Sequence, residues 1–320
     1  MITCKLVTAY YNIKRPKTTF KMFRGCFPVP KKKSDKKKPK KPKTDLKINK
    51  RRYVVFRSKT SENGADYGRI YFCDAKYQRL QVAVKTCDGR KEASMIKNEA
   101  KVLRKLYWHP NISEFIDFSG AKLFSKPYLV IRYFEGPDLC TFITLNNGRL
   151  REKPTQQIGK QILRGLEYVH SKKFAHLDIK PENILVKPAA ISQGFCVKII
   201  DFGFSRRARG KVEAYCGTPD YTAPEVHLFE PYDGYKADVW SYGVVIHKCL
   251  TGECLTEASA FFRMTTARDV EKVMAQDLYP SEACKDLMRR IFKVEPEERA
   301  GLKEVMNHRW FKNEKYKYSS

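Results

Sequence analysis

The sequence predicts an α+β protein of two lobes, the first rich in β-strands and the second mainly helical. Short runs of β-branched and aromatic residues, separated by turn residues, occupy the chain from residue 53 to 131, together with one helical pattern. From residue 135 to 311 apolar residues recur at helical spacing. A β-rich lobe followed by a helical lobe favours a ligand site in a cleft between them.

The expected elements of the first lobe are short strands around a single amphipathic helix. Within that helix Ile96, Ala100 and Leu103 share one face. The residue ranges, in chain order, are strands near 53–58, 68–73 and 81–87, a helix over 91–108, and strands near 114–118 and 127–134.

The second lobe is expected to hold four main helices, over 154–171, 236–252, 281–293 and 302–311. The second of these is apolar almost throughout, so we expect it to be buried, and Gly252 is a typical residue for its C-terminal end. The chain of 320 residues is long enough to give two lobes a sizeable core.

Positive charge is concentrated at the N-terminus. Residues 1–52 hold 19 Lys and Arg against 2 Asp and so carry 17 of the chain's 28 net positive charges. Nine lysines and two prolines lie within residues 31–43, where mutual repulsion and the prolines oppose a helix. We therefore expect 1–52 to be a mostly disordered basic extension, and residues 312–320 to be a C-terminal tail.

Three functions for the basic extension remain open: a nuclear address, a tether to nucleic acid or acidic proteins, and a solvated leader. Ten cysteines are scattered without paired spacing, which is typical of a reduced intracellular protein. We find no apolar run long enough to span a membrane. Cytoplasm, nucleus or both are therefore the expected locations.

Residues 176–186, HLDIKPENILV, bring together side chains that phosphoryl transfer requires. The reaction needs a carboxylate to orient the attacking hydroxyl, a cation on the moving phosphate, and oxygen ligands for magnesium. Asp178, Lys180 and Asn183 supply such groups, and a second carboxylate, Asp201, begins the Asp-Phe-Gly triplet 18 residues after Asn183. These motifs in this order, followed by Ala-Pro-Glu at 223–225, form a pattern that is highly specific for phosphoryl transfer.

From residue 53 to 311 the chain resembles a eukaryotic-type serine/threonine protein kinase domain. Val82-Ala83-Val84-Lys85 resembles the strand that carries the ATP-binding lysine, and Glu99 resembles the helical residue that pairs with it. The resemblance implies a bilobal fold with an N-lobe over 53–131, a C-lobe over 135–311, and an ATP cleft between them.

The resemblance also implies the roles of individual residues. Asp178 would be the catalytic base, Lys180 would contact the γ-phosphate, and Asn183 and Asp201 would hold Mg²⁺, with Mn²⁺ as a substitute. Thr218 would help to set the acceptor hydroxyl. The residues expected to bind ATP are Lys85, Glu99, Asn63, Gly64, Gly68, Ile70, Ala83, Ile131 (the gatekeeper), Arg132 and Phe134 (in the hinge), Asp138 (at the ribose) and Leu185. Glu225 and Arg299 resemble a buried ion pair that braces the helical lobe, and Asp238 and Trp240 resemble the anchor of its central helix.

The glycine loop is the weakest motif. Where protein kinases have three glycines, this chain has Asn63, Ala65 and Gly68. Asn tolerates positive φ and Ala is small, so the loop remains able to cover phosphates. A pseudokinase scaffold stays open as an alternative, but Lys85 and the other four catalytic positions are intact.

Lys180 and the segment CGTPDY at 216–221 resemble serine/threonine kinases and not tyrosine kinases. The segment between Asp201 and Ala-Pro-Glu has the length found in the cyclic-AMP-dependent kinase family. Leu177 stands where many kinases have an Arg that grips an activation-loop phosphate, and Ala214 stands where that family has its phosphothreonine. We therefore expect activity without activation-loop phosphorylation. Ser205 or Tyr215 as a control site is the alternative.

The substrate is less defined. Glu182 resembles a residue that meets basic side chains in arginine-directed kinases, whereas His247-Lys248 replaces the acidic residue such kinases tend to carry. A protein substrate and a monomer are expected. A lipid or small-molecule kinase and a nucleic-acid-binding protein are further alternatives, and the compact, basic chain would suit a kinase of a large DNA virus.

Overall fold

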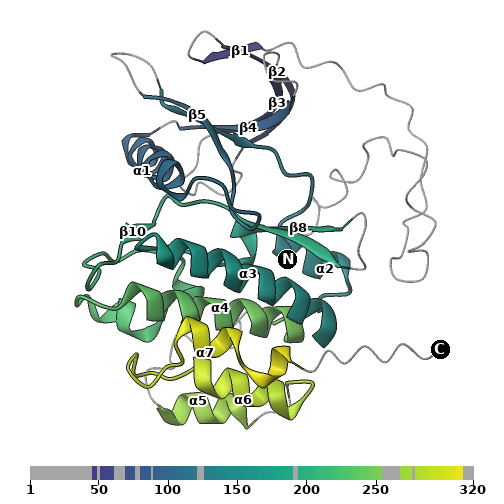
Figure 1. Ribbon diagram of the computed structural model, residues 1–320, viewed down its shortest axis with the longest axis vertical. Coiled ribbons are helices and arrows are strands. Elements are labelled where there is room, and N and C mark those ends of the chain that lie inside the picture. Colours follow the sequence, from purple (N-terminus) through teal and green to yellow (C-terminus); the bar gives the residue numbers. More distant parts are fainter. Residues whose placement is uncertain are drawn as a thin grey trace, which may run out of the picture.

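A computed structural model describes residues 45–48, 51–60, 69–75, 80–87, 89–120, 126–189, 194–253, 267–275 and 278–312. Figure 1 shows a curved sheet with one helix at its side, stacked on a second lobe made mainly of helices. The predicted two-lobed α+β fold is confirmed. The lysine-rich core of the basic extension, at 31–43, lies outside the described residues. So do residues 313–320 at the C-terminus and the expected ATP-binding residues Asn63, Gly64 and Gly68.

The sheet of the first lobe has six antiparallel strands in the order β1-β2-β3-β4-β6-β5. Its register places Ile70 opposite Lys85, and Ala83 opposite Ile131. The predicted adenine-side residues and the predicted lysine therefore belong to adjacent strands. The strands are β1 (Asp45–Ile48), β2 (Arg51–Thr60), β3 (Arg69–Ala75), β4 (Leu80–Thr86), β5 (Phe115–Ser119) and β6 (Tyr128–Arg132).

The sheet begins earlier than the sequence predicted. Strand β1 lies inside the stretch expected to be disordered, and it pairs with the start of β2, from Asp45 opposite Val54 to Ile48 opposite Arg51. The expectation of disorder was therefore wrong for residues 45–48 and 51–52, which belong to the sheet. The physical reason is that backbone pairing at a sheet edge needs no apolar face, and charged residues, especially Lys, are common on edge strands.

Helix α1 (Arg90–Leu106) packs against the sheet through its apolar face, where Ile96, Val102 and Leu103 are buried. It ends two residues before the predicted end because Tyr107 has a φ of 52°, which is outside the helical region. Glu99 lies on the buried face of this helix and is 2 % exposed. A carboxylate at such a position requires a partner.

The helical lobe is built around α4, which is buried at nearly every position. It starts after Asp233, whose side chain accepts hydrogen bonds from two backbone amides, and ends at Gly252 with a φ of 80°. The predicted helix over 302–311 stops after Met306, since the His308 ring caps a separate short turn. The helices are α2 (Leu139–Leu145), α3 (Glu152–Ser171), α4 (Gly234–Thr251), α5 (Ala267–Met274), α6 (Glu282–Ile291) and α7 (Leu302–Met306).

Two short β-pairs lie in the second lobe, where the sequence analysis placed no strands. Strand β8 (Ile184–Pro188) pairs with β9 (Phe195–Ile199), and β7 (Phe174–Ala175) pairs with β10 (Arg206–Arg207). Ile199 also exchanges backbone hydrogen bonds with the loop that follows α1: its amide donates to Asn111 and its carbonyl accepts from Ser113. The β8–β9 pair therefore contacts the loop that follows α1, and the predicted catalytic motifs lie next to these short strands.

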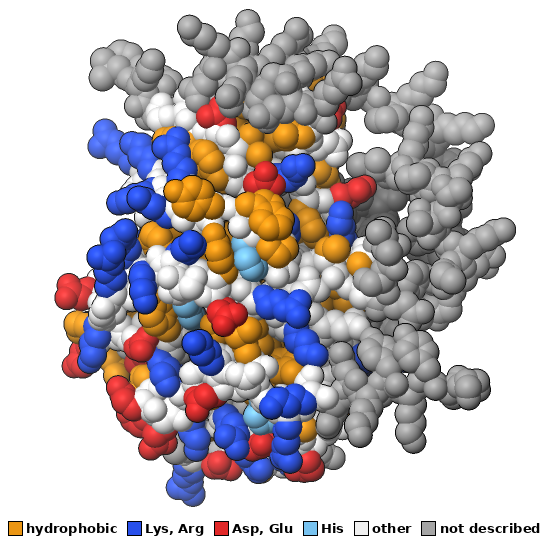
Figure 2. Space-filling view, viewed as in Figure 1, with side chains coloured by type: hydrophobic (Ala, Val, Ile, Leu, Met, Phe, Trp, Pro, Cys, Tyr) orange, Lys and Arg blue, Asp and Glu red, His pale blue; other side chains and the backbone are white. Residues whose placement is uncertain are grey.

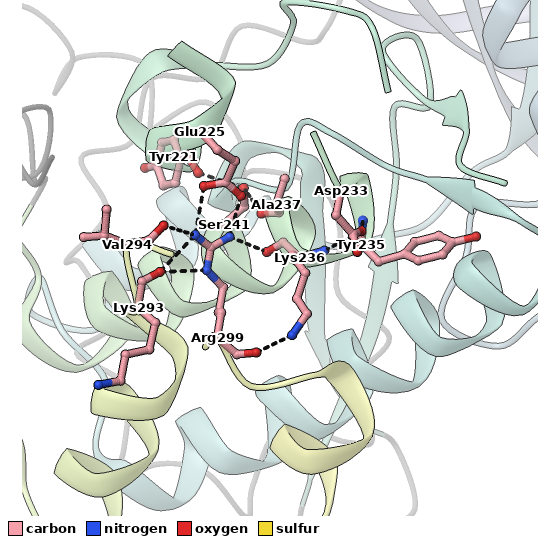
Figure 3. A network of polar contacts seen from close by, with 10 residues as sticks. All are labelled: Tyr221, Glu225, Asp233, Tyr235, Lys236, Ala237, Ser241, Lys293, Val294 and Arg299. Atoms are coloured by element: carbon pink, nitrogen blue, oxygen red, sulfur yellow. Dashed lines mark hydrogen bonds and ion pairs between the residues drawn. The ribbon is translucent and has the colours of Figure 1, made fainter. Parts of the chain in front are cut away.

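A buried ion pair braces the second lobe, as predicted. The Arg299 guanidinium donates to both carboxylate oxygens of Glu225 at 2.6 and 2.8 Å (Figure 3). It also donates to the carbonyls of Lys236, Lys293 and Val294 at 2.9 to 3.2 Å. Its plane lies 5.0 Å from the centre of the Trp240 ring. One side chain thus ties α4, the turn after α6 and the Ala-Pro-Glu segment together.

The surface of the described residues continues the positive charge of the N-terminus. In the face seen in Figure 2, Lys and Arg side chains gather on the flank that carries α1. Exposed Lys97, Lys101 and Lys105 lie on that helix. Within the described part of the chain, none of the helices is both long and apolar enough to cross a membrane.

Candidate active site

Lys85 and Glu99 form a buried ion pair between β4 and α1. The Lys85 ammonium donates to the two Glu99 oxygens at 2.8 and 2.9 Å, and it lies 3.7 Å from a carboxylate oxygen of Asp201. Burial would lower the pKa of Lys85, but the Asp201 and Glu99 carboxylates outweigh burial and raise that pKa above its ordinary value. The ammonium is therefore charged at neutral pH and faces the residue predicted to hold a metal.

Asp178 is the centre of a second polar cluster, at the end of the helical lobe nearest the sheet. The Thr218 hydroxyl donates to one oxygen of Asp178 at 2.7 Å, and the Asn183 amide donates to the other at 2.8 Å. Lys180 lies 3.2 Å from that second oxygen and donates to the Thr218 hydroxyl at 2.6 Å. The structure brings all four predicted catalytic residues together.

Asn183 and Asp201 are the two groups that could ligate a metal. Both hydrogens of the Asn183 amide nitrogen point to Asp178, at its side chain and at its carbonyl, which leaves the amide oxygen as the atom able to ligate. Asp201 adds carboxylate oxygens. Mg²⁺ is typically held by one or two carboxylates plus substrate phosphates, so a hard oxygen pair of this kind fits the ion. The described residues contain no cluster of three or more acidic, His or Cys ligands.

Asp238 of α4 fixes the backbone of the catalytic loop from below. Its carboxylate accepts hydrogen bonds from the amides of His176 and Leu177, both at 2.8 Å, and it contacts the ring of His170 at 2.8 Å. Leu177 has a φ of 65°, a left-handed conformation that is costly for a branched side chain. The buried carboxylate compensates for that strain and sets the position of Asp178, the next residue.

His176 is a structural residue. It is fully buried, and burial lowers its pKa, so the ring is neutral. One ring nitrogen accepts from the Asp178 amide at 3.2 Å and the other lies 3.1 Å from the Ile200 carbonyl. The ring packs edge-on against Phe202, which stands next to Asp201. The two ring nitrogens therefore hold the backbone at Asp178 and at Ile200, the residue before Asp201.

The residues predicted around adenine occupy the sheet and the start of the second lobe. Ala83 and Ile131 are 7 and 6 % exposed and face each other across β4 and β6. Leu185 on β8 forms a bridge with Asp138. In the hinge the Arg132 amide donates to the Glu114 carbonyl and the Tyr133 amide donates to the Gln81 carbonyl, at 2.9 and 3.0 Å.

Asp138 has a structural function that the sequence analysis missed. It is the N-cap of α2, where its carboxylate accepts from the Thr141 amide at 2.7 Å and from the Thr141 hydroxyl at 3.1 Å. The signal was present in the sequence as Asp138 three residues before Thr141. The predicted ribose contact stays a prediction.

The segment after Asp201 is anchored on the second lobe by backbone pairing and apolar contacts. Val212 and Tyr232 exchange two backbone hydrogen bonds, at 2.7 and 3.1 Å, and the Tyr232 hydroxyl donates to the Ala214 carbonyl. The side chains of Leu177 and Val212 meet around Gly234, where an added Cβ would lie within 3.4 Å of each. The Arg that many kinases carry beside the catalytic Asp is thus replaced by a buried apolar contact.

Ser205 and Tyr215, the alternative control sites, differ in exposure. Ser205 is 1 % exposed and its hydroxyl donates to the His176 carbonyl, so it is closed to a modifying enzyme in this arrangement. Tyr215 is 55 % exposed and stacks on Phe229.

These contacts agree with the comparisons with known proteins. The family description "protein kinase domain" matches residues 63–311. The chain belongs to this family.

The curated relatives include plant kinases. CBL-interacting protein kinase 21 of Oryza sativa subsp. japonica is 31 % identical over 283 residues, which is 82 % of this chain and 51 % of the relative. CBL-interacting protein kinase 32 from the same plant is 33 % identical, over 78 % of this chain and 58 % of the relative. CBL-interacting serine/threonine-protein kinase 15 of Arabidopsis thaliana is 33 % identical, over 77 % and 58 %. The chain spans little more than half the length of these relatives.

Proposed function

We propose that this protein transfers the γ-phosphate of ATP to serine and threonine hydroxyls of proteins. The observation that carries this proposal is the cluster in which Thr218 and Lys180 meet the Asp178 carboxylate. Thr218 belongs to the segment that would hold a peptide, and its hydroxyl already occupies a hydrogen-bonding position at the base. That link between acceptor segment and base favours a protein hydroxyl over a lipid or a small molecule.

The geometry supports a division of labour among these residues. Asp178 would accept a hydrogen bond from the incoming hydroxyl, orient it in line with the γ-phosphate and take its proton as the new bond forms. Lys180 would then balance the charge on the transferred group. Asn183 shares the Asp178 oxygen that faces Lys180, which keeps this carboxylate in one rotamer.

The nucleotide would lie between the sheet and the catalytic loop. We infer that Lys85, held by Glu99, contacts the phosphates, and that Ala83, Ile131 and Leu185 enclose the adenine. Since the Arg132 and Tyr133 amides donate within the protein, the Phe134 amide is the hinge donor we assign to adenine. A divalent ion, Mg²⁺ in this proposal, would be held by Asn183 and Asp201 and would neutralise phosphate charge.

The test is transfer of labelled γ-phosphate from Mg·ATP to a panel of serine, threonine and tyrosine peptides. The matched variants are Asp178→Asn, which removes the base, and Asp220→Asn, a conservative change in the same segment as Thr218. We expect Asp178→Asn to lose about 1,000-fold or more in rate, and Asp220→Asn to keep its activity. No transfer from a folded wild type would support the pseudokinase alternative instead.

We further propose that transfer requires no phosphate on the segment 201–218. Its support is the anchoring of that segment by Val212, Tyr232 and Leu177, and the burial of Ser205. The test compares activity and intact mass before and after phosphatase treatment. A large drop in activity with loss of a phosphate from this segment would contradict the proposal.

The basic extension is proposed to bind polyanions, either nucleic acid or acidic proteins. Because β1 is part of the sheet, the truncation that tests this function removes residues 1–44 and not the whole predicted extension. We expect the truncated protein to keep phosphotransfer to short peptides and to lose salt-sensitive binding to heparin and duplex DNA. Equal binding by both forms would move the proposed surface to the folded part of the chain.

A further inference from the structure

The side chain of Asn98 joins α1 to the start of the segment after Asp201. Its amide nitrogen lies 2.9 Å from the Gly203 carbonyl, 3.0 Å from the Ser205 carbonyl and 3.4 Å from the Phe202 carbonyl. An amide nitrogen carries two hydrogens, so the two shorter contacts use both and the third shares one. Three main-chain oxygens more than a hundred residues away in the sequence thus converge on one side chain.

The next residue of α1 forms the buried ion pair of the site. Glu99 accepts two hydrogen bonds from the Lys85 ammonium, and Lys85 lies 3.7 Å from Asp201, at the start of the same turn. Adjacent residues of one helix therefore hold the carbonyls of the turn after Asp201 and the lysine that faces it. A shift of α1 away from the second lobe would break these contacts together with the Lys85–Glu99 pair.

Besides Asn98, α1 places Met95 beside Gly203, whereas the anchors further along the segment lie within the second lobe. Ala208 donates to the Lys173 carbonyl, Val212 pairs with Tyr232, and Leu177 packs beneath them, all within the second lobe. In protein kinases, activation-loop phosphorylation and the position of this helix jointly control formation of the lysine–glutamate pair. In the proposed function the segment carries no phosphate, so another contact must hold α1 in place.

We propose that Asn98 is the positioning residue that holds α1, and through it Glu99, in the catalytic arrangement without a phosphorylated segment. The inference rests on the proposed phosphotransfer function. Asn98 touches none of the atoms expected to react; it acts through Glu99 and Lys85. The hydrogen bonds of the half-buried Asn98 amide would take the place of an ionic contact between an arginine and a phosphate.

Two substitutions separate this role from a general effect on the helix. Asn98→Ala removes both donors but raises helix propensity, so a loss of activity would not reflect a weaker α1. Asn98→Asp keeps the shape and places carboxylate oxygens against three carbonyl oxygens, so it should be the worse variant. Lys97→Ala, at the exposed neighbouring position, is the control.

The experiment measures kcat and KM for ATP, with thermal melting to confirm that each variant folds. We expect Asn98→Ala to lower kcat/KM about tenfold to a hundredfold, as for a catalytic group that is misplaced, and Lys97→Ala to stay within about twofold of the wild type, as for an exposed surface change. The deciding measurement repeats Asn98→Ala in a Glu99→Gln background. If Asn98 acts through Glu99, its substitution there costs about twofold or less, because coupled residues are not additive.

The proposal would be wrong if the losses in kcat/KM from Asn98→Ala and from Glu99→Gln multiply in full in the double variant. It would also be wrong if Asn98→Ala alone leaves kcat/KM unchanged. Hydrogen–deuterium exchange of residues 202–206 supplies a readout independent of activity: it should be faster in Asn98→Ala and unchanged in Lys97→Ala. If the wild type transfers no phosphate, the proposed function fails, and equal exchange in all three proteins would then also reject the role of Asn98.

Discussion

Two buried ion pairs of this protein use similar charges for different purposes. Arg299 donates to Glu225 and to three carbonyls, which occupy the guanidinium from every side. Lys85 makes two hydrogen bonds, both to Glu99, while its third neighbour Asp201 stays at 3.7 Å. The Arg299 pair is closed and braces the fold, whereas the Lys85 pair keeps capacity for a phosphate oxygen.

The comparison also shows why each site has its own cation. A guanidinium is a planar fork that can bind several fixed acceptors at once, and an ammonium is a compact charge on a flexible chain. The brace needs fixed geometry over several segments. In the proposed function the nucleotide side would need a charge that can move by a fraction of an ångström as the phosphates arrive. Exchanging the two residue types is therefore the sharpest way to test the distinction.

The largest effect is expected for Arg299→Lys. Lysine keeps the charge but cannot reach both Glu225 oxygens and three carbonyls, so buried acceptors are left without donors. Because several buried acceptors lose their donor at about 1 to 3 kcal/mol each, we expect a total loss of about 3 to 5 kcal/mol in the free energy of unfolding, measured by urea titration. Activity per folded molecule should be unchanged under conditions where the protein stays folded. A stability close to that of the wild type would mean that the brace is dispensable.

The reverse exchange, Lys85→Arg, should act on catalysis. The fork would remain bound to Glu99 and would displace the charge from the phosphates, at a cost of about 100-fold in kcat/KM, which is about 2.7 kcal/mol in the activation barrier. Urea titration should show a smaller loss of stability than for Arg299→Lys. If Lys85→Arg instead destabilises the protein more than it slows transfer, the division between the two pairs is wrong.

Removing both charges of the brace should cost less than breaking it. In Glu225→Leu with Arg299→Met no buried charge is left alone, but the carbonyls of Lys293, Val294 and Lys236 still lose their donor. We expect a loss of about 1 to 3 kcal/mol from these unsatisfied groups, less than for Arg299→Lys. A double variant as stable as the wild type would show that the carbonyl contacts contribute nothing. Urea titrations of the double variant and of the wild type, recorded side by side, measure the difference in the free energy of unfolding.

A surface ion pair provides the smallest effect. Asp286 contacts Arg290, His308 and Arg309, and although its slight burial opposes ionisation, the hydrogen bond with the His308 ring and the charges of the two arginines lower the pKa of the carboxyl below its ordinary value. A lowered folded-state pKa gives stability that is present above the unfolded-state pKa and is lost as the pH falls through the folded-state value. Asp286→Asn should therefore cost about 0.5 kcal/mol or less at pH 7. This difference should vanish in strongly acidic buffer, and a difference that grows with acid would reverse the sign argued here.

Long periodic elements and contiguous motifs could be read from the sequence. Helices α3, α4 and α6 lie within two residues of their predicted bounds because their apolar spacing extends over several turns. The catalytic cluster was predictable because Asp178, Lys180 and Asn183 share one short loop whose spacing is itself the signal.

The elements that were missed depend on tertiary contacts. Helix α2 is only seven residues long, too short for a periodic pattern, and its cap Asp138 was assigned to a ligand. Strand β1 is an edge strand defined by backbone pairing with β2. Asn98 gave no signal, because its partners are carbonyls, and every residue type has one.

The apolar anchor beneath the segment after Asp201 has a consequence for how the protein responds to its surroundings. A contact between arginine and phosphate weakens as salt screens its charges. Leu177 and Val212 pack beside Gly234 without any charge, so salt does not screen this contact, and it weakens on cooling, as apolar contacts do. A segment held in this way should keep its position when salt screens charges, and cooling should loosen it first.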